Sequence, residues 1–184
     1  GVILDFDESQ VRVRGVRQLQ PIAKIDTGIF PKFPSDLQAP FMVLMTQAAG
    51  VSKVFETLFE GRLNYLFELE KMGARFEFLN PHQAIILGPT PLKAAPIASC
   101  DIRAGAAMII AALMARGTSE ISSISYIDRG YERFDEKLRA LGAYIVRCQT
   151  EEDLKESPAR KPVALSSVAH AREGELEPSM TVQF

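Results

Sequence analysis

The amino-acid sequence predicts an α/β fold (α+β in its order of elements) built of βαβαββ repeats around central helices. Two observations lead to this fold class. Residues 36–45 and 101–110 both set an acidic residue at the start of a helix that is otherwise almost wholly apolar. Each is followed by a glycine, a β-rich run, an Arg-bearing amphipathic helix and a Gly-Ala pair. The two acidic residues lie 65 positions apart and the glycines of the pairs, Gly73 and Gly142, lie 69 apart, which indicates an internal repeat.

The composition is that of a globular domain of ordinary size. Of the 184 residues, 47% are hydrophobic and 24% are charged, enough for one real core. The net charge of −2 provides no general basic field, so we expect neither nucleic acid nor a membrane as partner. No signal peptide or membrane-spanning run is visible, which predicts a cytoplasmic protein. Cys100 and Cys148 match no metal spacing and are interpreted as buried free thiols.

Residues 1–24 are predicted to be the end of a preceding repeat. Residues 2–6 are mostly apolar, and residues 11–14 alternate between apolar and charged side chains. These patterns predict two strands joined by the polar turn 7–10. Because the strand pattern starts at once and no initiator Met is present, we expect a piece that begins in mid-domain.

Residues 25–92 are predicted to form the second repeat. After a short extended segment, Pro31 and Pro34 hold a non-helical approach to the first helix. Ser35-Asp-Leu-Gln38 has the form of a capping box, so a helix should start there, run to about Ala49 and end at the following glycine. The elements expected next are a strand over 51–58, an amphipathic helix over 62–72, and strands over 75–78 and 84–87.

Residues 93–148 are predicted to form the third repeat in the same order. The expected elements are a helix from 101 to about 116, a strand over 120–127, a helix over 130–141 and a strand over 143–148. Within the 130–141 helix, Asp135 and Arg139 form an i,i+4 pair. Its apolar face should consist of Tyr131, Phe134, Leu138 and Leu141. Residues 1–148 then make a partial domain of about two and a third units, with the first helix of each unit inside.

The last part of the chain, 149–184, has a different character. It is charged at its start, contains three prolines and shows no periodicity, which predicts a flexible tail. The alternative is that residues 180–184 dock as an edge strand.

Asp36 has two interpretations. As a residue of the first helical turn, its carboxylate would complement the helix dipole and have no further role. As a carboxylate presented in a cleft, it could accept a proton from a sugar hydroxyl. The residue type and its position leave both interpretations open.

Four arginines stand at or near predicted helix starts: Arg62, Arg103, Arg129 and Arg133. A cation at a helix N-terminus opposes the macrodipole, so nothing structural requires it there. Helix starts are natural anion sites, and several guanidiniums together can hold a phosphate or carboxylate bidentately. Each alone could also be an ordinary surface arginine. We assign no role to His82 or His170, and the sequence contains no metal cluster, Gly-rich phosphate loop or Ser-His-Asp pattern.

Six stretches of the sequence carry a recognisable pattern: Phe33-Pro-Ser-Asp-Leu-Gln-Ala, Glu56-Thr-Leu-Phe-Glu-Gly-Arg62, Met72-Gly-Ala, Cys100-Asp-Ile-Arg-Ala-Gly-Ala-Ala, Ile127-Asp-Arg-Gly-Tyr-Glu-Arg133 and Lys137-Leu-Arg-Ala-Leu-Gly-Ala. The most specific of these runs is Asp-Arg-Gly-Tyr-Glu-Arg. Together they resemble the UDP-N-acetylglucosamine 1-carboxyvinyltransferase family of enolpyruvyl transferases, and the resemblance covers roughly residues 20 to 148.

The resemblance implies a fold and a set of site residues. In this family each of two domains is an inside-out α/β barrel of three βαβαββ units, so the missing other domain would be a partner. Asp36 would lie against the sugar nucleotide and take the proton of its 3-hydroxyl, and Leu58 would line the same site. Arg103 and Arg129 would hold the phosphate and carboxylate of phosphoenolpyruvate, and Arg62 would belong to the same cleft. Asp101 would stand near the reacting carbons.

The implied reaction transfers the enolpyruvyl group from phosphoenolpyruvate to UDP-N-acetylglucosamine, the first committed step of peptidoglycan synthesis. It needs no metal and no organic cofactor, because fixed cations stabilise the charge. The family's proton-donating cysteine lies on the other domain, and Cys100 does not replace it, so we expect this polypeptide alone to be inactive. The alternatives are a 5-enolpyruvylshikimate-3-phosphate synthase-like transferase, a non-catalytic nucleotide-sugar-binding paralogue and a scaffold that keeps only the fold.

Overall fold

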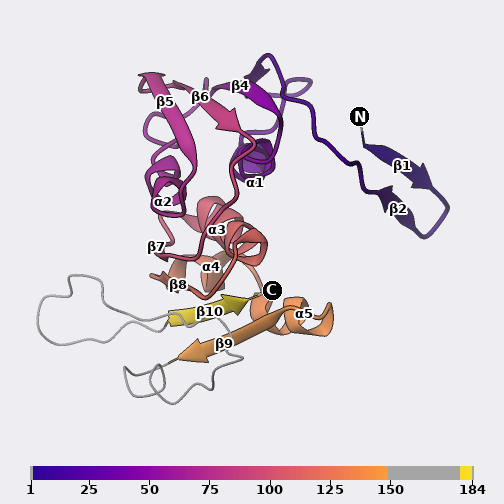
Figure 1. Ribbon diagram of the computed structural model, residues 1–184, viewed down its shortest axis with the longest axis vertical. Helices are drawn as coiled ribbons and strands as arrows, with labels where there is room; N and C mark the ends of the chain where they lie inside the picture. Colours follow the sequence, from indigo (N-terminus) through magenta and orange to yellow (C-terminus); the bar gives the residue numbers. More distant parts are fainter. Residues whose placement is uncertain (1, 149–178, 184) are drawn as a thin grey trace, which may run out of the picture.

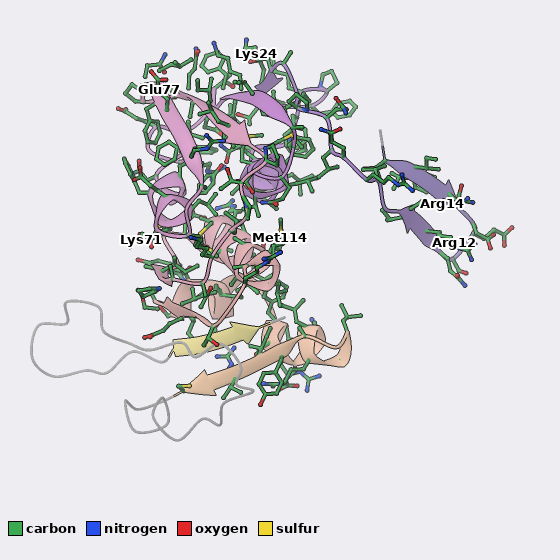
Figure 2. All side chains as sticks on the ribbon, viewed as in Figure 1. Arg12, Arg14, Lys24, Lys71, Glu77 and Met114 are labelled. Carbon is green, nitrogen blue, oxygen red and sulfur yellow. The ribbon has the colours of Figure 1, made fainter. Side chains whose placement is uncertain are left out.

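The hairpin at the start of the chain projects away from the remaining elements (Figure 1). The computed structural model describes residues 2–148 and 179–183, and the structural statements that follow refer to these residues. As predicted, β1 (Ile3–Phe6) pairs antiparallel with β2 (Val11–Arg14). The polar face of this hairpin carries Arg12 and Arg14 on β2 (Figure 2), and Arg14 forms an ion pair with Asp5 on β1.

The second predicted repeat contains a four-stranded sheet in the order β3-β4-β6-β5. The first pair of strands is parallel and the other two pairs are antiparallel. Two helices accompany the sheet, and the glycine after the second adopts φ +92°, a conformation that favours glycine. The elements are β3 (Ile25–Asp26), η1 (Ser35–Leu37), α1 (Gln38–Met45), β4 (Gly50–Phe55), α2 (Tyr65–Lys71), β5 (Arg75–Asn80) and β6 (Gln83–Gly88).

The third predicted repeat contains a sheet of the same design in the order β7-β8-β10-β9. Again the first pair is parallel and the other two are antiparallel. The elements are β7 (Pro96–Ala98), α3 (Ile102–Met114), β8 (Ser119–Ser122), α4 (Ser125–Gly130), α5 (Phe134–Ala140), β9 (Tyr144–Cys148) and β10 (Ser179–Gln183). The mixed α/β content predicted from the sequence is therefore present, with the strand order of one sheet repeated in the other.

The strand β10 corrects the expectation of a flexible tail for residues 179–183. It lies between β8 and β9 and pairs antiparallel with both, with Thr181 opposite Glu120 and Val146. This is the place that β6 occupies between β4 and β5 in the other sheet. The strand is therefore central in its sheet, and the edge position that was the sequence alternative is also wrong. Residues 149–178 and 184 of the predicted tail lie outside the described residues.

The two apolar helices α1 and α3 contact each other at the centre of the fold, and α3 lies between the two sheets (Figure 1). This confirms the prediction that the first helix of each repeat is internal. The largest fully buried side chains come from these helices and the elements around them: Met42, Leu63, Tyr65, Leu66, Leu69, Met72, Ile86, Met108, Ile109, Ile121, Ile124 and Ile127. Among the described helices none is long and apolar enough to cross a membrane.

Several boundaries differ from the sequence prediction; for example, β4 ends at Phe55 rather than at 58, and α2 begins at Tyr65 rather than at 62. α1 ends at Met45 rather than near Ala49. The strand expected over 120–127 stops at Ser122, because the chain turns at Ser123, with φ 57°, and enters α4. The helix expected over 130–141 begins at Phe134, since Arg133 adopts a left-handed conformation just before it.

The predicted contacts of α5 are mostly present. Arg139 Nη2 donates to Asp135 Oδ2 at 2.9 Å, which confirms the i,i+4 pair. Tyr131, Phe134 and Leu138 pack against the core. Leu141 does not, because its side chain is 84% exposed beyond the end of the helix.

Candidate active site

Asp36 lies in η1, at the entrance to α1, where two guanidinium groups meet its carboxylate. Arg103 Nε donates to Asp36 Oδ1 at 2.7 Å, and Arg62 Nη1 lies 3.5 Å from the same oxygen. The Asp36 side chain is 62% exposed, so the group is open to solvent. Within residues 2–148 no hydrogen bond to Oδ2 is present, which leaves this oxygen available to a ligand.

Arg62 is held more firmly than a surface arginine. Its side chain is only 14% exposed, and Nη1 donates to Ser35 Oγ at 2.6 Å. The guanidinium also lies over the ring of Phe59, 4.0 Å from the centroid, as in a cation–π contact. These contacts fix the plane of the guanidinium beside Asp36.

Asp101 and Arg103 form the start of α3. Asp101 Oδ1 accepts hydrogen bonds from the backbone N–H groups of Arg103 and Ala104, both at 2.8 Å, so Asp101 is the N-cap of the helix. The cap sets the direction of the first turn, and the Arg103 side chain leaves that turn toward Asp36. Asp101 thus has a structural role beside its predicted one.

Leu58 and Arg129 lie in two other segments, the loop after β4 and the helix α4. Leu58 follows β4 in the same loop as Phe59 and is 44% exposed. Arg129 is an exposed residue of α4, and in the described part of the chain no hydrogen bond or ion pair joins it to the other predicted site residues. Its neighbour Gly130 packs directly against Ile102, the residue before Arg103, which brings this end of α4 to the start of α3.

The sequence prediction missed two residues beneath the site, Ser35 and Glu56. Ser35 was predicted to cap α1, but η1 and α1 have no side-chain cap. Its hydroxyl donates to Glu56 Oε2 at 2.7 Å instead. A signal for Glu56 was available, because alternation along β4 puts it in phase with the buried residues Ser52 and Val54.

Two titratable groups near the site, Tyr65 and Cys100, have a raised pKa, which favours their neutral forms. Burial raises the pKa of the Tyr65 hydroxyl well above its ordinary value, and the charges of Glu56 and Asp101 raise it further. Cys148 is buried as predicted, but Cys100 is exposed as a residue. Burial of the Cys100 thiol nevertheless raises its pKa to about 11, with the charges of Glu68 and Asp101 adding to the effect. A thiol with this pKa is protonated at neutral pH and is a poor nucleophile.

Comparisons with known proteins identify the family of the chain. Residues 3–138 match the EPSP synthase (3-phosphoshikimate 1-carboxyvinyltransferase) family. The chain is 44% identical over 147 residues to UDP-N-acetylglucosamine 1-carboxyvinyltransferase 2 from Prochlorococcus marinus, which covers 80% of this chain and 34% of that protein. It is 40% identical over 152 residues to the enzyme of the same name from Listeria monocytogenes, covering 83% and 36%.

A solved structure gives the same result for the fold. The enolpyruvyl transferase NikO from Streptomyces tendae superposes with a TM-score of 0.68 at 25% identity, over 77% of this chain and 32% of that chain. The chain spans about a third of the length of the curated relatives it matches. Because the family match extends from residue 3 to residue 138, this chain belongs to the EPSP synthase family, the family of the enolpyruvyl transferases.

Proposed function

We propose that the chain forms one wall of an active site that transfers the enolpyruvyl group from phosphoenolpyruvate to the 3-hydroxyl of UDP-N-acetylglucosamine. In this reaction the hydroxyl oxygen bonds to C2 of phosphoenolpyruvate while C3 gains a proton. Phosphate then leaves C2 and C3 loses a proton, which restores the double bond. The product enters peptidoglycan synthesis. The names of the two relatives at 44% and 40% identity support this substrate.

One observation supports the proposal most directly: Oδ1 of Asp36 makes the shortest contact of the carboxylate with both guanidiniums. Oδ2 is then the oxygen that would accept the proton of the sugar hydroxyl as this hydroxyl attacks. The two guanidiniums would hold the carboxylate in one orientation during the transfer.

The other predicted residues receive roles on the two sides of Asp36. We assign Leu58 and Arg62 to the nucleotide sugar. Arg103 and Arg129 are assigned to the phosphate and carboxylate groups of phosphoenolpyruvate, because guanidiniums bind both groups bidentately. Asp101 would remain near the reacting carbons. Its position at the mouth of α3 supports this role.

The whole enzyme would consist of two inside-out α/β barrels of three βαβαββ units each. This chain would contribute about two and a third units of one barrel, divided at residues 1–24, 25–92 and 93–148. The matching strand orders of the two sheets support this division. The free thiol of Cys100 is in keeping with the cytoplasm as the compartment of the protein.

A shikimate-type transferase is the second candidate, because the matching family is described as 3-phosphoshikimate 1-carboxyvinyltransferase. Both candidates use phosphoenolpyruvate and differ in the hydroxyl that attacks it. A nucleotide-sugar-binding protein without catalysis is the third possibility. It differs from both in releasing no phosphate.

The test is a fusion in which this chain replaces the corresponding segment of the Listeria monocytogenes relative. Phosphate release is measured with phosphoenolpyruvate and either UDP-N-acetylglucosamine or shikimate 3-phosphate. We expect release with UDP-N-acetylglucosamine alone. Release with shikimate 3-phosphate alone would support the second candidate. Calorimetric binding of UDP-N-acetylglucosamine without phosphate release, in a folded fusion, would support the third.

A further inference from the structure

Glu56 is a wholly buried carboxylate whose two oxygens are divided between two segments of the candidate site. Oε2 accepts a hydrogen bond from Ser35 Oγ at 2.7 Å, and Oε1 accepts one from the Leu58 N–H at 3.0 Å. Ser35 precedes Asp36, and Leu58 precedes Phe59 in the loop after β4. A single side chain therefore connects the entrance of α1 to the loop after β4.

The connection extends through Ser35 to Arg62. A serine hydroxyl has one proton, which is directed to Glu56, so its lone pairs accept the hydrogen bond from Arg62 Nη1 at 2.6 Å. This order of donors, Arg62 to Ser35 to Glu56, requires an acceptor at its end. A carboxylate is an acceptor on both oxygens and also accepts from Leu58.

The backbone of Glu56 is fixed from the opposite side. Its N–H donates to the His82 carbonyl at 2.8 Å, and His82 Nδ1 lies 2.9 Å from the Glu56 carbonyl oxygen. Because that carbonyl can only accept, Nδ1 carries the proton. The β5–β6 turn thus holds Glu56 rigidly, and Glu56 in turn holds the loop and η1.

We propose that Glu56 is a positioning residue of the active site, which orients Arg62 through Ser35 and fixes the backbone of Leu58. The effect of Glu56 on catalysis rests on the proposed transfer to UDP-N-acetylglucosamine. Glu56 itself does not touch the substrate in this proposal. It acts by keeping Arg62 next to Asp36 before the ligands arrive, so that their binding need not order these groups.

Glu56→Gln tests the proposal because it keeps the shape and changes the polarity. The glutamine has one acceptor oxygen and one NH₂ donor. If NH₂ faces Leu58, two donors oppose each other. If NH₂ faces Ser35, the hydroxyl proton must turn toward the Arg62 cation. Glu77→Gln is the control, since Glu77 is an exposed residue of β5, the edge strand of the β3-β4-β6-β5 sheet (Figure 2).

The first measurement is hydrogen exchange and NMR of the 184-residue chain. In Glu56→Gln we expect the Leu58 amide to exchange about tenfold faster or more, and the Arg62 guanidinium signals to shift. Glu77→Gln should leave both unchanged. A second variant, Ser35→Ala, breaks the connection at one end, and should shift Arg62 while the Leu58 amide stays protected. The proposal is overturned if Arg62 does not respond in Ser35→Ala, or if neither group responds in a folded Glu56→Gln chain.

The second measurement is kinetic and uses the fusion with the Listeria monocytogenes relative. We expect Glu56→Gln to raise KM for UDP-N-acetylglucosamine about tenfold. Glu56→Gln combined with Ser35→Ala should cost no more than the worse single change, because both break the same connection. A fall in the amount of active enzyme at unchanged KM would mean a merely structural role. If the unsubstituted fusion releases no phosphate with UDP-N-acetylglucosamine, the proposed function fails, while the exchange of Leu58 still decides the positioning role.

Discussion

Arg103 Nε donates to Asp36 Oδ1 at 2.7 Å across 67 positions of sequence, and so joins the starts of α3 and α1. Both side chains are open to solvent, with 39% of Arg103 and 62% of Asp36 exposed. An exposed ion pair contributes about 0–1 kcal/mol to the free energy of unfolding. Stability is therefore a weak reason for this contact, and placement of the carboxylate is a better one.

Asp36→Ala should separate stability from activity. We expect the free energy of unfolding of the chain to change by less than about 1 kcal/mol, because the Asp36 carboxylate is exposed in both of its ion pairs. In the fusion with the Listeria monocytogenes relative, kcat should fall by about 100-fold or more, since the proposed general base is removed. The affinity for UDP-N-acetylglucosamine should fall much less. Urea unfolding, phosphate release and calorimetry measure the three quantities.

Asp5→Ala is the matched control for this change. Asp5 forms an ion pair of similar exposure with Arg14, at 2.7 Å in the hairpin far from the site. It should alter neither stability nor kcat by a measurable amount. An unchanged kcat in Asp36→Ala would exclude Asp36 as the base.

The packing of Gly130 predicts a steric effect near Arg129. A Cβ at Gly130 would collide with Cγ2 of Ile102, so Gly130→Ala should push α4 away from the start of α3. We expect the free energy of unfolding to fall by about 1–2 kcal/mol despite the better helix propensity of alanine. Gly15→Ala, with no atom within 4 Å of the added Cβ, should be neutral. Equal urea midpoints for Gly130→Ala and the unsubstituted chain would contradict this packing.

Much of the fold could be predicted from the sequence because its signals are local. The apolar stretch around α3, its Asp101 start and the glycines after α2 and α5 all identify elements without tertiary knowledge. The start of α5 and the end of β8 could not be predicted, because they depend on left-handed residues, Ser123 and Arg133, that no pattern identifies. The tail strand β10 was missed for another reason. Its partners are distant in sequence, and five residues carry little periodicity.

The candidate site was predicted only in part. The charges at the helix starts identified Asp36, Arg62 and Arg103, which the structure brings together. Ser35 was misinterpreted as a helix cap, since its local pattern fits one. The hydroxyl bonds Glu56 instead, and this partner lies 21 positions away. Buried polar contacts between distant segments are not encoded in any short motif.

The carboxylate of Asp135 predicts how stability depends on pH. Burial acts to raise the pKa of Asp135, but hydrogen bonds and charge from Arg147 and the charge of Arg139 outweigh it, and the pKa is lowered. A group with a lowered pKa in the folded state stabilises fully above its unfolded pKa of about 3.9, and this stabilisation is lost as pH falls through the folded pKa. The contribution should therefore be constant between about pH 5 and 7 and decline below about pH 4.

Arg147→Met tests this linkage. Arg147 Nη2 lies 2.9 Å from Oδ1 of the buried Asp135, so its removal should lower the free energy of unfolding by about 2 kcal/mol at pH 7. The difference should shrink below about pH 4, because a protonated Asp135 no longer needs the cation. Arg14→Met, in the exposed pair with Asp5, should cost less than about 1 kcal/mol at every pH. Urea unfolding at pH 7, 5, 4 and 3 gives the comparison, and a pH-independent cost of Arg147→Met would contradict it.

The position of β10 predicts that residues 179–183 stabilise the β7-β8-β10-β9 sheet. Thr181 pairs with Glu120 on one side and Val146 on the other, so Thr181→Pro should break a central strand, where proline lacks the N–H of the ladder. We expect a loss of about 2 kcal/mol in the free energy of unfolding and faster hydrogen exchange of the Val146 amide. Thr181→Val keeps the backbone N–H and should keep both.

Thr181→Pro also tests whether β10 stabilises both of its neighbouring strands or only one of them. If β10 does for its sheet what β6 does between β4 and β5, its loss leaves β8 and β9 without a partner between them, and both should lose protection together. Protection lost in β9 alone would mean that β10 is a partner of one strand only. Unchanged exchange in both strands would mean that the sheet is stable without residues 179–183. In that case β10 would not have the structural role in its sheet that β6 has in the other sheet.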